Sequence, residues 1–337
     1  MESSLRTKNG VFPVIAALGG NALITVMKFV GFSVSGSGAL FSEAIHSTAD
    51  TLNQVLLLIG IKLSTRKADD NYSYGYGLER FFWALVSACG VFFLGAGVTI
   101  YHGIHSLQNT TVPDFGTVPI VILSISFILE SATFIFALRE LNTKNPGMSM
   151  KKKLKEGDPA TIAILYEDGV AVLGVFIAFV SIIVSIATRN PFFDALGSIL
   201  IGILLGIVAI LLIQKNRSYL IGRNIPDDVK EEIIRIMEAD PTIEKVLDFK
   251  SSILDVGEYQ IKCDVEFNGP ALMKEIMENS SLRDEYEDVR NDYQNFIKFI
   301  VRSVGRVPRL MGTSIDTLEL RIKKEIPEVK HIDIEIN

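Results

Sequence analysis

Six long stretches of mostly apolar residues occupy the first two thirds of this 337-residue chain. They cover roughly residues 11–33, 39–64, 81–107, 117–138, 159–186 and 192–214, and a helix of about 20 such residues crosses a bilayer. No stretch of this kind follows Arg223. The first stretch lacks a small-residue cleavage pattern, so we expect it to be retained as a span rather than removed as a signal peptide.

The composition agrees with a chain that has one membrane domain and one domain outside the membrane. Hydrophobic residues make up 48% of the sequence and the mean hydropathy is +0.34, which is too apolar for a soluble protein of this size. From Pro226 onward there are 25 Asp and Glu against 16 Lys and Arg. We therefore predict a six-span domain over 1–223 and an acidic domain over 224–337. The negative charge argues against nucleic acid or anionic lipid as partners of this second domain.

Basic residues in the short connections predict the orientation of the spans. Lys and Arg flank the second connection and crowd the fourth, at Lys62, Arg66, Lys67, Arg80, Arg139, Lys144, Lys151, Lys152, Lys153 and Lys155. The first and third connections contain none, and the fifth contains only Arg189. Because cytoplasmic loops are enriched in Lys and Arg, both termini are expected in the cytoplasm.

The residues after Pro226 alternate in a way that favours a small α+β domain. We expect helices at about 227–239, 270–303 and 312–325, and strands at about 243–253, 256–267 and 330–336. Asp255, Val256 and Gly257 lie between the first two strands and are typical of a hairpin turn. The resulting αββαβ order predicts a ferredoxin-like fold, an open sheet with helices on one side.

A polar stripe runs through the second apolar stretch. Glu43, His46, Asp50 and Asn53 lie within about 80° of one another on a helix. Ionisable groups near the bilayer centre are costly and therefore usually functional, and the spacing of His46 and Asp50 suits two ligands of one divalent metal ion. A buried polar pair that joins two helices is the alternative. Glu43 lies nearer the outer side and is a candidate for metal exit or proton exchange.

The fifth apolar stretch contributes carboxylates at a comparable depth. Asp168 lies about nine residues from the cytoplasmic end of its span, or roughly 13–14 Å deep, and Glu167 is its neighbour. The candidate metal ligands are therefore His46, Asp50, Asp168 and Glu167. A proton carrier and a hydrogen bond between helices are the alternatives for Glu167, and Asn53, Asn21 or water could replace it as the fourth ligand.

Several other polar residues have open roles. Asn21 either joins this site or bonds to a neighbouring helix, and Glu130 is either structural or part of a proton path. His102 and His105 at the outer end of the third span are more typical of a wet interface than of a metal site. Cys89 and Cys263 belong to different domains, so neither a disulfide nor a thiolate metal cluster is expected.

Three local motifs resemble the cation diffusion facilitator family of divalent metal/proton antiporters. They are Leu40-Phe41-Ser42-Glu43-Ala44-Ile45-His46-Ser47-Thr48-Ala49-Asp50, Tyr74-Gly75-Tyr76-Gly77-Leu78-Glu79-Arg80 and Gly197-Ser198-Ile199-Leu200-Ile201-Gly202. The resemblance covers nearly the whole chain. It implies a homodimer that exports a transition metal such as Zn²⁺ from the cytoplasm through a tetrahedral site on spans two and five.

The chain departs from the family pattern in span five and in the second domain. The family's span-five histidine falls on Ile164, which cannot bind metal, so Glu167 is the nearest replacement. This Glu-Asp pair resembles a branch related to a eukaryotic mitochondrial or nuclear-associated zinc transporter. In the second domain Leu247 and Lys262 replace expected ligands, and only His331 with Asp333 remains. The resemblance therefore implies a regulatory metal site that is absent or reduced, in a domain that mainly dimerises.

The mechanism requires metal and protons to exclude one another, because ligands must lose their protons to bind metal and histidine titrates near neutral pH. One imidazole and several carboxylates suit Zn²⁺, Mn²⁺, Fe²⁺ or Co²⁺, and the imidazole favours zinc. No resident cofactor and no enzymatic activity are expected. A metal-dependent membrane hydrolase and a non-transporting metal sensor are the competing classes. We expect a multi-pass protein of the lipid bilayer, in the cell (inner) membrane if the source is prokaryotic.

Overall fold

A computed structural model describes residues 3–108, 116–144, 147, 149–150, 153, 159–278, 282–290 and 292–337. The chain forms two compact units. The first comprises Met1–Leu63 and Glu79–Arg217, and the second comprises Ser64–Leu78 and Ser218–Asn337. Most of the third connection and most of the basic segment 151–155 lie outside the described residues.

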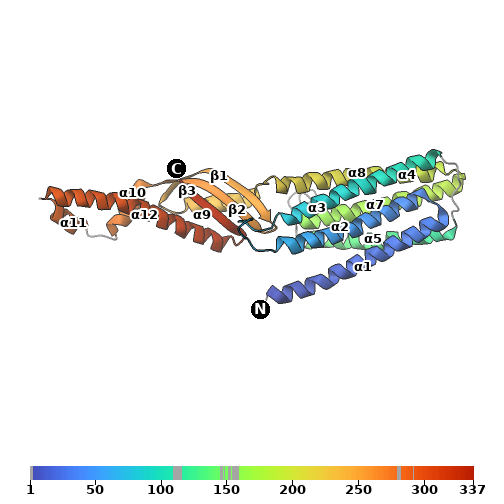
Figure 1. The fold of residues 1–337 in the computed structure, drawn as a ribbon, viewed down its shortest axis with the longest axis horizontal. Coiled ribbons are helices and arrows are strands. Elements are labelled where there is room, and N and C mark those ends of the chain that lie inside the picture. Colours follow the sequence, from blue (N-terminus) through green and yellow to red (C-terminus); the bar gives the residue numbers. More distant parts are fainter. Residues whose placement is uncertain are drawn as a thin grey trace. The chain divides into compact units, whose positions relative to one another are not determined.

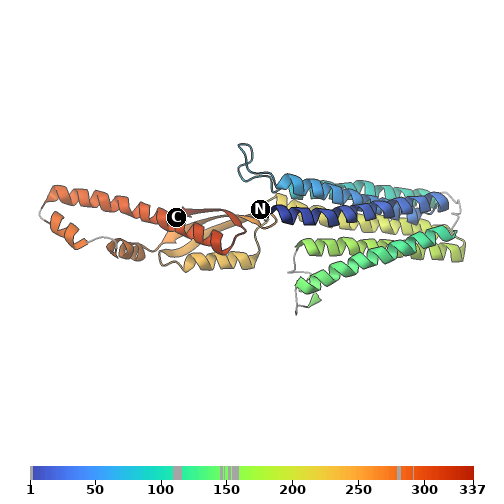
Figure 2. The same ribbon diagram turned by 90° about the horizontal axis from the view of Figure 1, so that it is seen from below.

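The first unit consists of long helices that run side by side (Figures 1 and 2). Their bounds are α1 (Ser3–Ser35), α2 (Gly38–Ser64), α3 (Glu79–Gly90), η1 (Val91–Ala96), α4 (Gly97–Gln108), α5 (Thr117–Lys144), α7 (Pro159–Thr188) and α8 (Phe192–Leu220). Each predicted apolar stretch is helical. The third contains a π-helical turn, η1, which nothing in its apolar pattern had indicated.

Five helical segments in the described part of the chain are long and apolar enough to cross a membrane. They are Leu18–Ser35, Glu79–Gln108, Thr117–Thr143, Leu165–Thr188 and Phe192–Leu220. The helix that carries the polar stripe, α2, has 27 residues but is not among the five. Large apolar side chains such as Phe93 and Phe136 are about 70% exposed on these helices. Such a surface requires lipid around it, so this is an integral membrane protein.

Glycines allow two of the membrane helices to pack closely. A Cβ atom on Gly103 of α4 would lie 2.6 Å from the Ile199 side chain, and one on Gly202 of α8 would lie 2.6 Å from Ile100. Because small residues let membrane helices approach one another, these two positions explain the close contact of α4 with α8. Gly202 belongs to the third motif identified in the sequence.

The second unit contains a three-stranded sheet flanked by helices (Figure 1). Its elements are α9 (Asp227–Glu238), β1 (Ile243–Asp255), β2 (Glu258–Phe267), α10 (Gly269–Glu278), α11 (Leu282–Val289), α12 (Tyr293–Glu325) and β3 (Val329–Ile336). The strand order is β1-β2-β3, with β1 antiparallel and β3 parallel to β2. The predicted hairpin is confirmed. Gly257 adopts φ +74° in its turn, a conformation that favours glycine.

The core of this unit lies between one face of the sheet and the helices α9 and α12. Ile261, Cys263 and Val265 alternate along β2 and are buried together with Met237 of α9 and Ile322 of α12. This alternation follows from the two-residue period of a strand. All three strands therefore lie close to their expected positions, whereas the stretch 270–303, predicted as one helix, contains α10, α11 and the start of α12 as separate helices.

The expected break between 303 and 312 is wrong. A single helix, α12, continues from Tyr293 to Glu325 and contains Pro308. Asp292 caps its first turn by accepting hydrogen bonds from the backbone of Gln294 and Asn295. A proline removes one internal hydrogen bond, and here the buried residues near the C-terminal end hold the helix against the sheet.

Two nearby residues of α12 should contribute very differently to the stability of this unit. Ile322 is fully buried and Leu320 is 70% exposed. We expect Ile322→Ala to lower the free energy of unfolding by about 2–5 kcal/mol, because it leaves a cavity. Leu320→Ala should change it by less than about 0.5 kcal/mol. Denaturant unfolding of a fragment covering 218–337 measures both, and equal effects would contradict the assigned core.

The connection between α2 and α3 packs within the second unit. The rings of Tyr74 and His331 meet edge to face with centroids 5.0 Å apart. A Cβ atom on Gly77 would lie 2.5 Å from the carbonyl oxygen of Leu254, so only glycine fits there without a shift. The second sequence motif therefore includes residues that hold this connection against the β1–β2 hairpin.

Candidate metal site on helices α2 and α7

The start of α2 is held by a carboxylate from another helix. Asp194 of α8 accepts hydrogen bonds from the backbone nitrogen of Gly38 (2.5 Å) and from the Ser37 hydroxyl (2.6 Å). A carboxylate stabilises a helix N-terminus by satisfying its free N–H groups and by opposing its dipole. This contact fixes the position from which the polar stripe of α2 runs.

His46 and Asp50 lie one turn apart on the same face of α2, as their spacing predicts. The distance from His46 Nε2 to Asp50 Oδ2 is 3.6 Å, which is too long for a hydrogen bond. The His46 side chain is only 5% exposed, and among the described residues neither of its ring nitrogens has a hydrogen-bond partner. A buried imidazole without a partner is costly, so this group is suited to bind a ligand.

Asn53 connects the stripe to helix α7. Its Nδ2 donates a hydrogen bond of 2.8 Å to Oε1 of Glu167, and its Oδ1 accepts one of 2.8 Å from the Ser87 hydroxyl of α3. Glu167 therefore makes a hydrogen bond between helices, which was one of the two alternatives to its predicted role as a metal ligand. Because Asn53 lies three residues after Asp50 on α2, this bond places Glu167 of α7 beside the polar stripe.

The structure does not bring the four predicted ligands into a closed cluster. Among the described side chains, no three His, Cys, Asp or Glu residues lie close enough to hold a metal ion. His46 lies near Asp50, and Glu167 is joined to Asn53. The donor set nevertheless contains one imidazole and three carboxylates, which are ligands that divalent transition metals accept.

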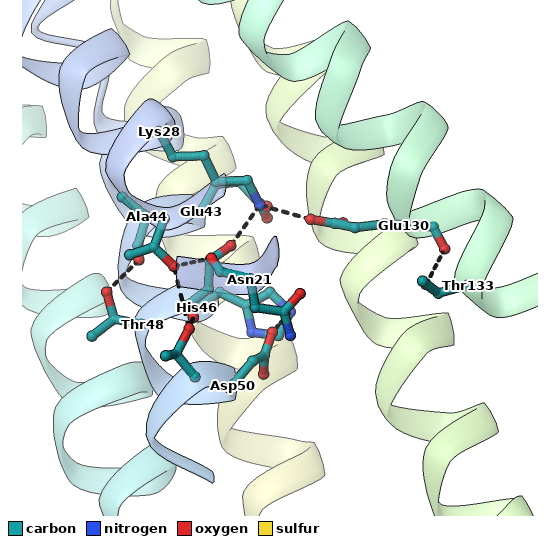
Figure 3. Close-up of polar contacts among 12 residues, drawn as sticks. Asn21, Lys28, Glu43, Ala44, His46, Thr48, Asp50, Glu130 and Thr133 are labelled. Carbon is teal, nitrogen blue, oxygen red and sulfur yellow. Dashed lines mark hydrogen bonds and ion pairs between the residues drawn. The ribbon is translucent and has the colours of Figure 1, made fainter. Parts of the chain in front are cut away.

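A charged cluster one turn away from His46 is the main feature that the sequence did not reveal (Figure 3). Lys28 of α1 is completely buried. Its Nζ lies 2.8 Å from Glu43 Oε2 and 2.8 Å from Glu130 Oε1, and it donates a third bond of 2.8 Å to the Ser47 hydroxyl. A charge within an apolar stretch was the available signal for Lys28, but its partners depend on which helices are neighbours.

The remaining predicted polar residues have simpler surroundings. The ring of His102 lies 4.3 Å from that of Phe41, centroid to centroid, so His102 contacts an aromatic ring rather than lying wholly in water as the sequence favoured. The backbone carbonyl of Asn21 accepts a bond from Thr25, and the role of the Asn21 side chain stays a prediction. Cys89 and Cys263 are free thiols, as expected.

In the second unit, acidic residues near His331 already have a cationic partner. Lys262 of β2 donates a hydrogen bond to Glu335 of β3 and lies 3.9 Å from Asp333. The bond to Glu335 raises the pKa of Lys262 above its usual value. Burial raises the pKa of the Cys263 thiol to about 12, so the thiolate that metals require is disfavoured.

Comparison with known proteins identifies relatives that cover both units. Residues 14–221 match the model of the cation efflux transmembrane domain. The chain is 34% identical over 331 residues to metal tolerance protein C4 of Arabidopsis thaliana, covering 96% of this chain and 72% of the plant protein. It is 35% identical over 329 residues to the mitochondrial proton-coupled zinc antiporter SLC30A9 of Homo sapiens, covering 96% of this chain and 58% of the human protein.

A bacterial relative matches over a shorter region. The magnetosome protein MamB of Magnetospira sp. (strain QH-2) is 26% identical over 210 residues, which cover 61% of this chain and 65% of that protein. The present chain thus spans little more than half of the human relative and nearly three quarters of the plant relative.

Proposed function

The chain belongs to the cation efflux, or cation diffusion facilitator, family, and we propose that it exports a divalent transition metal ion from the cytoplasm in exchange for protons. Zinc is the ion that we favour. Members of this family are transporters rather than enzymes, so the alternative of a metal-dependent membrane hydrolase has no support. The name of the human relative, a proton-coupled zinc antiporter, agrees with the proposed ion and coupling.

The observation that carries this proposal is the buried imidazole of His46 beside Asp50, whose ring nitrogens have no hydrogen-bond partner among the residues that the structure describes. A transported ion needs ligands inside the membrane that are not already bonded to other groups of the protein. We assign the four ligands to His46 and Asp50 of α2 and to Glu167 and Asp168 of α7. The hydrogen bond from Asn53 of α2 to Glu167 of α7 supports this pairing of helices.

We further propose that α2 is a sixth span. Its 27 residues exceed the length that a bilayer requires, and its buried polar stripe accounts for its lower hydropathy. With six spans, both termini lie on the cytoplasmic side, as the basic connections predict. The second unit would then be cytoplasmic, with a ferredoxin-like fold. We place the protein in the cell (inner) membrane if its source is prokaryotic.

Proton coupling follows from competition for the same atoms. A metal ion binds the neutral imidazole and the ionised carboxylates, whereas protons on these groups prevent ligation. Protons that arrive from the outer side displace the ion, and the proton-poor cytoplasmic side allows a new ion to bind. The imidazole of His46 and the carboxylates of both helices therefore bind either a proton or the metal ion, and this competition couples the two movements.

Anomalous diffraction from crystals grown with zinc tests the assigned site directly. We expect one ion between α2 and α7, within about 2.0–2.2 Å of His46 and of at least one carboxylate oxygen. Because the described ligands do not form a closed cluster, binding of the ion requires the ligands of α2 and α7 to move closer together. An ion found elsewhere in the first unit, with this region free of anomalous density, would contradict the assignment.

Glu167 replaces the missing ligand at Ile164 in this account, and one variant tests that role. Glu167→Gln keeps an oxygen that can accept the bond from Asn53 and removes only the charge. If Glu167 is a ligand, zinc affinity should fall on the order of tenfold or more, because a neutral amide binds a divalent ion poorly.

The same variant distinguishes a proton carrier from a ligand. Loss of a proton carrier should leave zinc affinity nearly unchanged and flatten the pH dependence of transport. Zinc titration and a pH profile of transport, measured on one preparation, separate these outcomes. If Glu167→Gln has the zinc affinity and the pH profile of the natural chain, Glu167 serves only in the packing of the helices.

We propose that the second unit dimerises and binds zinc only weakly. Lys262 already pairs with Glu335 and Asp333, and a cationic side chain repels a metal ion. A fragment covering 218–337 should therefore form dimers in analytical ultracentrifugation without tight zinc binding. Calorimetry that detects two tightly bound zinc ions per fragment would contradict this proposal.

A further inference from the structure

The ammonium group of Lys28 occupies a site that is built to hold a cation (Figure 3). An ammonium group has three N–H donors, and all three are used, by Glu43, Glu130 and Ser47. These partners come from α2 and α5, whereas Lys28 comes from α1. Three helices therefore converge on one positive charge, and the Lys28 and Glu43 side chains have no exposed surface.

The carboxylate oxygens around the Lys28 ammonium group outnumber the hydrogen bonds that it can donate to them. Glu43 Oε1 and Glu130 Oε2 are buried and have no hydrogen-bond partner in the described part of the chain. The two unpartnered nitrogens of His46 lie three residues further along α2, a rise of about 4.5 Å. Two carboxylates that each bind Lys28 through one oxygen, and whose other oxygen has no partner among the described residues, provide more ligand atoms than a monovalent cation requires.

The surrounding backbone leaves room for the free oxygen of Glu43. A Cβ atom on Gly174 of α7 would lie 2.5 Å from Glu43 Oε1, so a glycine at this position allows the carboxylate to reach α7. The cluster thus touches both helices of the candidate metal site. It lies beside the predicted ligands without sharing a carboxylate with them.

We propose that Glu43 and Glu130 form a second binding site for a divalent transition metal ion, which Lys28 fills as a tethered substitute cation. The ammonium group and a divalent ion compete for the same carboxylate oxygens, because two cations at this spacing repel strongly in a buried setting. Lysine suits this role, since its long flexible stem lets the charge withdraw without moving the helix.

This inference rests on the proposed function for its role in transport. An ion that leaves His46 and Asp50 toward the outer side would meet Glu43 next, and Lys28 would keep it from being trapped there. Binding of a metal at the second site is a separate property and does not require that transport occurs. Stoichiometry of binding therefore tests the site independently.

Equilibrium zinc binding to the purified full-length protein in detergent is the test. Lys28→Met removes the tethered charge with little change in side-chain length, and it should bind one zinc ion per chain more than the natural protein. Lys28→Arg keeps a cation and should bind the same number as the natural protein. An equal number of ions bound by Lys28→Met and the natural chain would overturn the proposal.

A charge-matched variant locates the additional ion. The double variant Lys28→Met, Glu130→Gln loses one positive and one negative charge together, so the additional ion should disappear. Adding Glu43→Gln instead of Glu130→Gln should have the same effect. An additional ion that persists in both double variants would place it elsewhere and would also overturn the proposal.

Two further variants control for misfolding and for overlap between the two sites. If Lys28→Met is not monodisperse in gel filtration, Lys28→Gln offers hydrogen-bond donors without charge and takes its place with the same expected count. Combining Lys28→Met with Asp168→Ala separates the two sites. If the additional ion remains there while the proposed transport site fails its own test, the second site stands and the proposed function does not.

Discussion

Asp50→Ala and Asp168→Ala should each abolish zinc uptake into inside-out vesicles. Each removes a carboxylate from one of the two helices that form the proposed site, and the ion then lacks a charged ligand inside the membrane. Breaking a buried charge pair costs about 3–5 kcal/mol, which corresponds to more than about a hundredfold in affinity. Uptake at a fixed low zinc concentration should fall to the level of empty vesicles.

A residue on the same helix provides the matched control. Thr48 lies two residues from both His46 and Asp50, and its hydroxyl bonds to the carbonyl oxygen of Ala44 in its own helix. Thr48→Ala should retain most of the uptake, and all three variants should elute like the natural protein in gel filtration. Near-normal uptake by either aspartate variant would refute the assigned site.

His46→Asp should retain transport and shift the metal preference. Replacing the imidazole by a carboxylate leaves an all-oxygen donor set, which suits harder ions such as Mn²⁺. The ratio of zinc to manganese uptake should fall by about tenfold or more. Competition between the two ions in one vesicle preparation measures this ratio directly.

His102 is the appropriate control for the histidine variant. It lies against Phe41 near the start of α2 and belongs to no proposed metal site. His102→Gln should therefore leave the zinc-to-manganese ratio unchanged. If His46→Asp also left the ratio unchanged, His46 would not be a ligand.

Features that depend on a single element could be predicted from the residues alone. The apolar stretches predicted helices because membrane length and residue composition are sufficient for that inference. The alternation around Ile261 and Cys263 predicted β2 for a similar reason. The spacing of His46 and Asp50 predicted their shared face, because it follows from the pitch of one helix.

Features that depend on several elements could not be predicted. Glu130 has no cation on its own helix before Arg139, and its partner Lys28 comes from a helix about a hundred residues earlier. The bond from Asn53 to Glu167 likewise requires α2 and α7 to be neighbours. No periodicity within one segment contains this information.

The error in α12 has a different origin. Gly305, Pro308 and Gly312 each lower helix propensity in the segment where the expected helices were separated. Local propensity is a weak guide when tertiary packing opposes it, and buried residues such as Leu318 and Ile322 hold the helix against the sheet.

Zinc-driven proton movement in proteoliposomes tests whether the protein exchanges metal ions for protons. The natural protein is reconstituted with a pH-sensitive dye inside, and zinc is added outside without any imposed proton gradient. We predict that zinc entry will be accompanied by loss of protons from the lumen, and that Asp50→Ala will show neither. Zinc entry without proton movement would contradict antiport, and zinc binding without entry would instead identify a non-transporting metal sensor.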